Sequence, residues 1–283
     1  IGFAGMMIAV FSITLGWPMW MAIIVTFVIC IAFGALNGFI VVRTGLPSFI
    51  VTLATLFILR GFTIFIPQTL ERKTIIGGLR EAAEGDWLAP IFGGKILTGF
   101  FQWLGDMGVI GVFTRGNLEG KPVVDGIPML IVWALGLVVF GHILLTRTRF
   151  GNWIFAAGGD AQAARYAGVP VDRVKIMMFM FTAFVATVFA TSQVMEFGSA
   201  GSDRGVLKEF EAIIAVVIGG ALLTGGYGSV VGAALGALIF GVVQQGLFFA
   251  NVESSLFRVF LGVILLFAVI LNTYIRRMIT GER

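Results

Sequence analysis

Residues 18 to 42 read "PMWMAIIVTFVICIAFGALNGFIVV" and contain no charged side chain. A helix rises about 1.5 Å per residue, so roughly 20 mostly apolar residues cross a hydrocarbon core of about 30 Å. This stretch is long enough, and it lacks the strict alternation of a membrane β-strand. It therefore predicts a transmembrane helix.

The rest of the chain has the same character. Of its 283 residues, 58% are hydrophobic and 12% are charged, whereas soluble domains carry about 25% charged residues. We expect an all-α, polytopic integral membrane protein with about eight hydrophobic helices or half-helices. The expected spans are 3–16, 18–42, 47–66, 128–146, 176–195, 213–224, 229–250 and 256–275.

Two of these spans are unusual. Segment 213–224 is too short to cross alone, so it begins before Glu211, is tilted, or is half of a broken helix closed by "TGGYGS" at 224–229. The first span follows Ile1 without a charged region. We therefore expect not a signal peptide but a chain whose amino-terminal portion is missing.

The basic residues predict an orientation. They gather in short segments at Arg43, around residues 147–175, and at the carboxyl end, which the positive-inside rule places in the cytoplasm. The net charge of +4 therefore reports topology rather than nucleic-acid binding. The long segment 67–127 then lies outside the cytoplasm. Within it, the apolar stretch 96–113 either lies in the membrane interface or packs on the outer ends of the spans.

Several kinds of chemistry lack a signal in the sequence. A single Cys30 and a single His142 exclude an internal disulfide and make a metal site improbable, so we expect no metal. No GxxxxGK[ST], HExxH or GxSxG pattern is present, which predicts neither catalytic residues nor a nucleotide cofactor on this chain. No carboxylate lies clearly at mid-membrane, and this disfavours an ion-coupled carrier.

Small and polar residues within the spans suggest further roles. Gly228, Gly232 and Gly236 are four residues apart and form a smooth face for helix packing, for a dimer interface or for a moving pore helix. Polar side chains in the spans either tie helices together or hydrogen-bond a hydroxyl-rich solute. The candidates for a solute pathway are Asn37, Thr52, Gln193 and Gln244.

A short polar helix is predicted within "FAAGGDAQAARYAGVPVDRVK" at 155–175. Asp160 suits the N-cap, "AQAARYA" at 161–167 favours a helix, Gly168 suits the C′ position and Pro170 blocks continuation. Isolated helices of this length are marginal in water, so this one depends on contacts within the chain or with a partner.

The region 151–175, "GNWIFAAGGDAQAARYAGVPVDRVK", resembles the cytoplasmic loop of permease subunits of sugar-type ABC importers, the ribose, xylose and arabinose group. The stretches "EFEAIIAVVIGGALLTGGYGSVVGAALGALIFGVVQQGL" (209–247) and "GALNGFIVVRTGLPSFIVTLATLFILRG" (34–61) are similar to that family as well. The charged segment 67–127 is longer than the family pattern.

The resemblance implies a single transmembrane permease domain over 1–283, with an extracytoplasmic segment at 67–127 and a cytoplasmic coupling loop at 147–175. It implies a multi-pass homodimer in the bacterial inner membrane, without a cofactor of its own. Its implied partners are a cytosolic ABC ATPase, an extracytoplasmic solute-binding protein and the lipid bilayer. The ATPase would dock on the coupling helix and its caps, which are Gly158, Gly159, Asp160, Ala164, Arg165 and Gly168.

The expected function is thus that of a pore subunit, not an enzyme, which moves a monosaccharide or related polyol by alternating access. The alternatives are an ABC permease for a branched-chain amino acid or nucleoside, an ion-coupled secondary transporter, and a membrane scaffold without transport.

Overall fold

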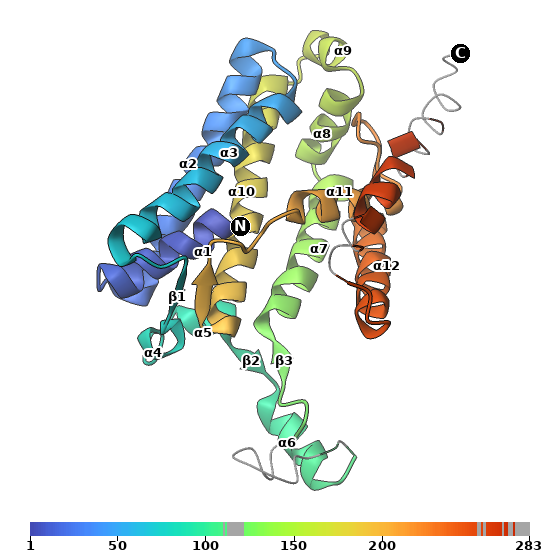
Figure 1. The fold of residues 1–283 in the computed structure, drawn as a ribbon. Coiled ribbons are helices and arrows are strands. Elements are labelled where there is room, and N and C mark those ends of the chain that lie inside the picture. The colour runs from blue at the N-terminus through green and yellow to red at the C-terminus, as the bar shows by residue number, and fades with distance from the viewer. Residues whose placement is uncertain are drawn as a thin grey trace. The chain divides into compact units, whose positions relative to one another are not determined.

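The computed structural model describes residues 1–109, 111, 122–253, 256, 259–267, 269–270 and 274 (Figure 1). Its apolar segments are helices, which confirms the all-α polytopic fold class. Within the described part, five helices are long and apolar enough to cross a membrane. They are α2 (Met19–Thr44), α3 (Ser48–Glu71), α7 (Met129–Arg147), α10 (Val171–Phe197) and α12 (Val230–Phe249).

Shorter elements connect the long helices. The shorter helices are α1 (Gly2–Ala9), the π-helix η1 (Val10–Thr14), α4 (Leu79–Ala82), α5 (Ala89–Gly93), α6 (Thr98–Asp106), α8 (Arg149–Gly159), α9 (Ala161–Tyr166) and α11 (Lys208–Ile218). The strands are β1 (Ile75–Gly77), β2 (Lys95–Ile96), β3 (Ile127–Pro128) and β4 (Ser199–Gly201). Seven expected spans correspond to these helices. For the eighth, 256–275, the described residues include helix at 259–267, and the remainder lies partly outside the described residues.

Some boundaries differ from those expected. Helix α3 continues through Pro67 to Glu71, beyond the expected end at 66. Helix α11 begins at Lys208 and ends at Ile218, so it starts before Glu211 as one alternative predicted. Its 11 residues extend about 16 Å at the helical rise, which is half of a membrane crossing.

The chain divides into two compact units. One contains Ile1–Leu135 and Ile176–Arg204, and the other contains Gly136–Lys175 and Gly205–Arg283. Helices α7 and α10 contribute residues to both units. The expected single permease domain over 1–283 stays a prediction.

The first unit is built around α1, α2 and α10. Its buried core includes Met6, Ile23 and Val188, one from each of these helices. Glycine permits α2 and α10 to approach closely, because a Cβ on Gly34 would lie 2.7 Å from the carbonyl oxygen of Phe179.

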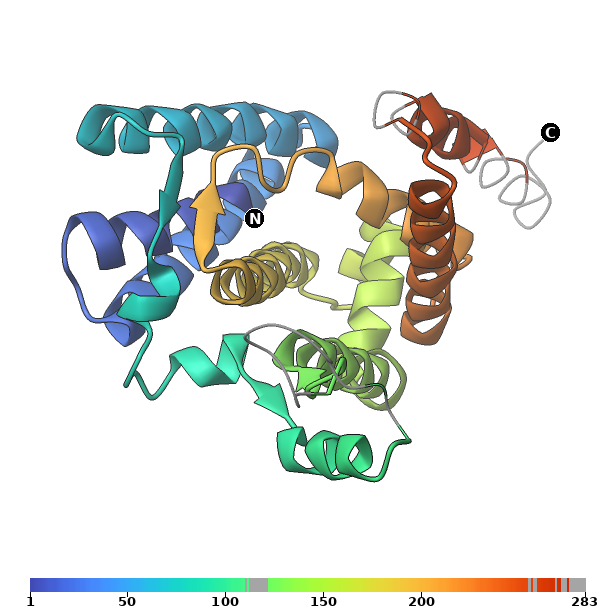
Figure 2. The ribbon, with the colours of Figure 1, turned by 60° about the horizontal axis from the view of Figure 1, so that its bottom comes forward.

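The start of the long segment 67–127, cyan in Figure 2, packs against this core. Strand β1 pairs antiparallel with β4, directly after α10, and Ile76, Leu79 and Phe92 are buried in the core. Asp86 accepts hydrogen bonds from the backbone nitrogen of Trp20 at 2.8 Å and from that of Leu88 at 2.8 Å. One carboxylate therefore caps the beginning of α2 from within this segment.

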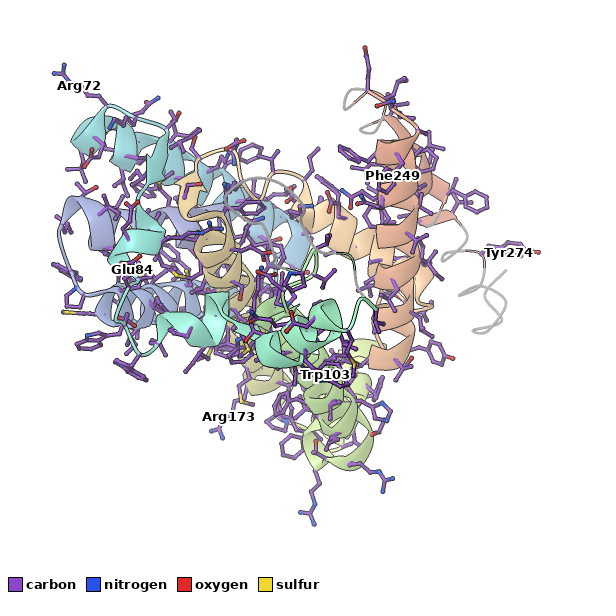
Figure 3. All side chains as sticks on the ribbon, turned by 90° about the horizontal axis from the view of Figure 1, so that it is seen from below. Arg72, Glu84, Trp103, Arg173, Phe249 and Tyr274 are labelled. Carbon is purple, nitrogen blue, oxygen red and sulfur yellow. The ribbon has the colours of Figure 1, made fainter. Side chains whose placement is uncertain are left out.

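The later part of the segment is less covered. Strands β2 and β3 pair antiparallel and lead into and out of α6, where Phe100 and Trp103 are exposed. Figure 3 labels Trp103 on this helix. About half of each of these two side chains is exposed, and the place of the apolar stretch 96–113, in the interface or on the ends of the spans, stays a prediction. Residues 110 and 112–113 of the apolar stretch lie outside the described residues.

In the second unit, α11 and α12 form a tight pair. Ile214 of α11 and Phe240 of α12 are buried together with Leu261. Helix α12 begins at the N-cap Ser229, whose hydroxyl accepts a hydrogen bond from the Gly232 nitrogen at 3.0 Å. Eleven residues, 219–229, separate the two helices and include the sequence "TGGYGS".

Candidate functional site

The site consists of α8, α9 and the first turn of α10, all within residues 148–175. Thr148 caps α8, because its hydroxyl oxygen accepts a hydrogen bond from the Gly151 nitrogen at 3.1 Å. The backbone nitrogen of Asp160 donates to the carbonyl of Ala156 at 3.2 Å and so closes α8. The chain then turns at Asp160 into α9.

Asp160 is also the N-cap of α9. Its Oδ1 accepts hydrogen bonds from the nitrogens of Gln162 at 2.8 Å and Ala163 at 2.9 Å. These are two of the backbone donors that lack a helical partner in a first turn. One carboxylate thus fixes the beginning of a helix that has only six residues.

A Schellman motif ends α9. The nitrogen of Gly168 donates to the carbonyl of Arg165 at 3.0 Å, and that of Val169 donates to the carbonyl of Ala164 at 3.0 Å. Gly168 has a φ of +82°, a left-handed conformation that glycine adopts without a Cβ clash. Both ends of α9 are therefore closed by local hydrogen bonds.

The two faces of α9 differ. Ala164 is buried, whereas Tyr166 is 84% exposed and receives a hydrogen bond from Gln162 Nε2 at 3.4 Å. The Arg165 guanidinium forms an ion pair with Asp172 in the first turn of α10. The side chain of Arg173 projects away from the ribbon (Figure 3).

This surface suits a protein partner. Arg165 is a donor that stays charged, and its ion pair with Asp172 is about half exposed, so water screens it and it is worth at most about 1 kcal/mol. The pair can therefore be exchanged for a carboxylate of another protein at little cost. The exposed phenol ring of Tyr166 adds apolar area beside the charge.

The six residues predicted for docking lie together around one turn. Gly158 and Gly159 end α8, Asp160 links α8 to α9, and Ala164, Arg165 and Gly168 follow in α9 and its cap. Their role in docking stays a prediction. Gly158 has an additional neighbour, because a Cβ on it would lie 2.6 Å from the nitrogen of Gly226.

The predicted glycine stripe meets α11 and its loop. A Cβ on Gly232 would collide with the backbone oxygen of Gly219, and a Cβ on Gly236 would collide with that of Ala215. A Cβ on Gly228 would lie 2.9 Å from the Cβ of Ala221. Packing within one chain therefore uses this stripe, and its role in a dimer or a moving pore stays a prediction.

The four candidates for a solute pathway are not brought together as one cluster. Asn37 Oδ1 accepts a hydrogen bond from the Thr55 hydroxyl at 2.5 Å, which ties α2 to α3. The Thr52 hydroxyl donates to the carbonyl of Ser48 in its own helix at 3.0 Å. Gln193 lines a small crevice beside Arg204, and Gln244 is half-buried on α12. Their contact with a solute stays a prediction.

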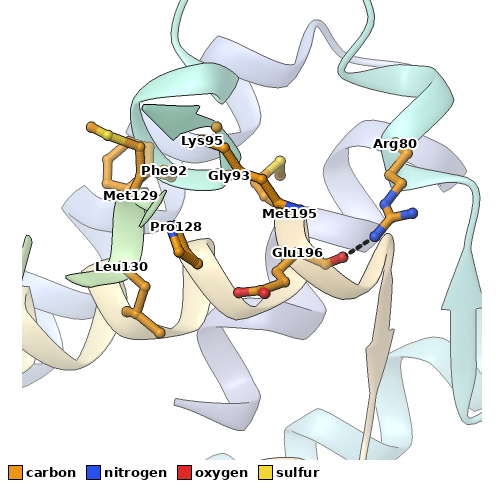
Figure 4. A pocket seen from close by; sticks show the side chains of 10 residues that line it. Arg80, Phe92, Gly93, Lys95, Pro128, Met129, Leu130, Met195 and Glu196 are labelled. Carbon is orange, nitrogen blue, oxygen red and sulfur yellow. Dashed lines mark hydrogen bonds between the residues drawn. The ribbon is translucent and has the colours of Figure 1, made fainter. Parts of the chain in front are cut away.

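A larger pocket of about 320 Å³ lies in the first unit (Figure 4). Its charged lining residues are Arg80, Lys95 and Glu196, and the Arg80 guanidinium donates to the backbone carbonyl of Glu196. Phe92, Met129 and Met195 supply apolar walls. Lys95 Nζ is ion-paired with Asp125 at 2.5 Å, and the Glu196 carboxylate supplies an acceptor for a hydroxyl group, which both donates and accepts hydrogen bonds.

Sequence reasoning missed two parts of this arrangement. The sequence reasoning did not identify Asp172 as the partner of Arg165. A basic residue before Pro170 and an acidic residue after it could have predicted this ion pair across the turn. The contact of Gly158 with the loop at Gly225 and Gly226 was also missed. Two Gly-Gly pairs, 158–159 and 225–226, were its only trace in the sequence.

Comparisons with known proteins agree with the membrane-spanning fold. Residues 2–269 match the family described as branched-chain amino acid transport system / permease component. The chain is 31% identical to the xylose transport system permease protein of Escherichia coli (strain K12), covering 98% of this chain and 76% of that protein. It is 30% identical to the xylose permease of Haemophilus influenzae, with coverages of 96% and 79%.

A relative from another transport system also matches. The autoinducer 2 import system permease protein of Salmonella paratyphi B is 30% identical, covering 90% of this chain and 68% of that protein. No solved structure matches.

Proposed function

The chain belongs to the family described as permease components of branched-chain amino acid transport systems. Within this family, we propose that it imports a monosaccharide or related polyol. It is a multi-pass protein of the inner membrane and the transmembrane pore subunit of an ABC importer. The match over residues 2–269 is the observation that carries this conclusion. The two xylose permeases support the choice of a sugar.

We propose that a separate cytosolic ATPase docks on α9. A permease needs a contact that a partner can push, and α9 has closed ends, a buried Ala164 and the exposed side chains of Arg165 and Tyr166. ATP hydrolysis would take place on that partner, and this chain would carry no cofactor. If the two conformations of the ATPase bind the outward-facing and inward-facing states of this chain with different free energies, the change between them would shift the pore from one state to the other.

We further propose that the segment 67–127 lies outside the cytoplasm and receives solute from a binding protein. The pocket of Arg80, Lys95 and Glu196 is then an entry site for a hydroxylated solute. A second copy of the chain would complete the pore.

Reconstitution tests the function directly. The chain in proteoliposomes, with its ATPase and binding protein, should accumulate radiolabelled xylose only when ATP is inside. Arg165→Glu should abolish co-purification of the ATPase while the chain still inserts into the membrane. Uptake without ATP that follows an ion gradient would contradict the proposal.

The family description supports one alternative solute, a branched-chain amino acid. The same proteoliposomes distinguish the two: excess unlabelled leucine should leave xylose uptake unchanged. If leucine is accumulated and xylose is not, the sugar assignment is wrong while the importer function stands.

A further inference from the structure

The carboxyl end of α8 touches the loop between α11 and α12 through backbone atoms. A Cβ on Gly158 would lie 2.6 Å from the Gly226 nitrogen, and a Cβ on Gly225 would lie 2.8 Å from the Gly158 oxygen. A Cβ on Gly226 would lie 2.8 Å from the Cα of Gly159. Each distance is shorter than a Cβ contact tolerates, so only glycine on both sides permits this approach.

On one side of the contact, Asp160 alone joins α8 to α9. Asp160 closes α8 through its own nitrogen and opens α9 through its carboxylate. A displacement of α9 therefore moves the end of α8, because Asp160 is the only residue between the two helices and is hydrogen-bonded to both.

On the other side, the loop is attached to a tight helical pair. The Leu222 nitrogen donates to the Tyr227 carbonyl at 3.0 Å, which closes the loop around Gly225 and Gly226. Helices α11 and α12 meet at backbone distance, with Gly232 against Gly219. A displacement of the loop therefore moves both helices.

We propose that Gly158, Gly225 and Gly226 are positioning residues that transmit movement of α9 to the α11–α12 pair. The inference rests on the proposed docking of an ATPase to α9. No side chain lies between the two backbones, so no rotamer change absorbs a displacement. Packed contacts of this kind transmit small shifts instead of deforming.

Gly158→Ala tests the inference, with Gly241→Ala in α12 as its control. Both residues lie in helices, and alanine favours a helix more than glycine does. At Gly158 the new methyl meets the loop backbone at 2.6 Å, whereas at Gly241 it has no neighbour within 4 Å among the described residues. The two variants thus differ mainly in this one contact.

The loop side has its own matched pair. Gly226 and Gly220 both have positive φ, +79° and +83°, so alanine is strained to a similar degree at each. A Cβ on Gly226 meets Gly159, whereas a Cβ on Gly220 meets nothing within 4 Å among the described residues. Loss of function specific to Gly226→Ala is therefore not explained by strain.

The readout is the number of solute molecules imported per ATP hydrolysed in proteoliposomes. We expect Gly158→Ala and Gly226→Ala to lower this ratio about fivefold or more, the lower end of typical coupling between two sites. Co-purification of the ATPase with the Gly226→Ala variant should persist. Gly241→Ala and Gly220→Ala should keep a ratio close to that of the unchanged chain.

A ratio unaffected by Gly158→Ala would overturn the inference. The inference would also be overturned if Gly158→Ala lowered both thermal stability and uptake but left the number of solute molecules imported per ATP unchanged. That result would indicate a contact with a structural role only. Failure of the proposed function looks different: the ATPase would then bind equally well to the Arg165→Glu variant, whatever the glycine variants do.

Discussion

Removing the N-cap of α9 provides the sharpest test of the docking helix. Asp160→Ala deletes an oxygen that accepts from two backbone nitrogens, at 2.8 and 2.9 Å. Loss of such a cap costs about 1 kcal/mol. A helix of six residues has little stability of its own, so this loss falls directly on its folded population.

The magnitude follows from that free energy. A change of about 1 kcal/mol alters the ratio of folded to frayed α9 about fivefold. If the ATPase binds only the folded helix, its apparent affinity falls by the fraction that is lost, up to about fivefold. Binding of the purified ATPase to the permease in nanodiscs, measured by biolayer interferometry, detects such a change.

Asp160→Asn is the control that separates capping from charge. Asparagine caps a helix about as well as aspartate, so the affinity should stay within about twofold of the unchanged chain. An Asn variant as weak as the Ala variant would refute the capping argument and indicate a direct contact of the carboxylate with the partner. An Ala variant with full affinity would refute the role of the helix itself.

Substitutions at four other residues test packing, helix capping and the pocket. Gly34→Ala should destabilise the chain by about 1–3 kcal/mol in a thermal unfolding scan, because its methyl would meet a backbone oxygen at 2.7 Å. Gly61→Ala in α3, which has no neighbour within 4 Å among the described residues, should leave stability unchanged or raise it. Asp86→Ala should lower stability by about 1–2 kcal/mol, since it removes the cap of α2, and Asp86→Asn should recover part of the loss. Glu196→Gln should raise the half-saturating concentration for uptake about threefold to tenfold without lowering the maximal rate, and an unchanged value would exclude the pocket from the solute path.

Hydropathy predicts the long helices because lipid demands an apolar surface along their whole length. The expected span 18–42 corresponds to α2 at Met19–Thr44. A span predicted from hydropathy is too short where charged residues extend the helix beyond the apolar run. Helix α10 begins at Val171 rather than 176, since Val171 and Val174 are buried while Asp172 and Arg173 face outward.

Local chemistry predicts the docking helix for a similar reason. The caps of α9 depend on Asp160 and Gly168, which lie within nine residues of each other and have strong positional preferences. The cap of α2 could not be predicted in this way. Its carboxylate, Asp86, lies 66 residues from Trp20 in the sequence, and no pattern within either segment points to the other.

The glycines of the second unit show why a residue type alone does not identify its role. Gly168 and Gly220 adopt positive φ in helix-ending motifs, whereas Gly158 and Gly232 admit a neighbouring backbone. Gly241, on the same helix as Gly232, does neither among the described residues. Glycines spaced by four predict a smooth helix face, but they do not predict which segment packs against it. The contact of Gly158 with Gly226, 68 residues away, likewise leaves no periodic signal in the sequence. Gly158 and Gly241 are both helical glycines, yet alanine at Gly158 should lower the coupling ratio, whereas alanine at Gly241 should leave it unchanged.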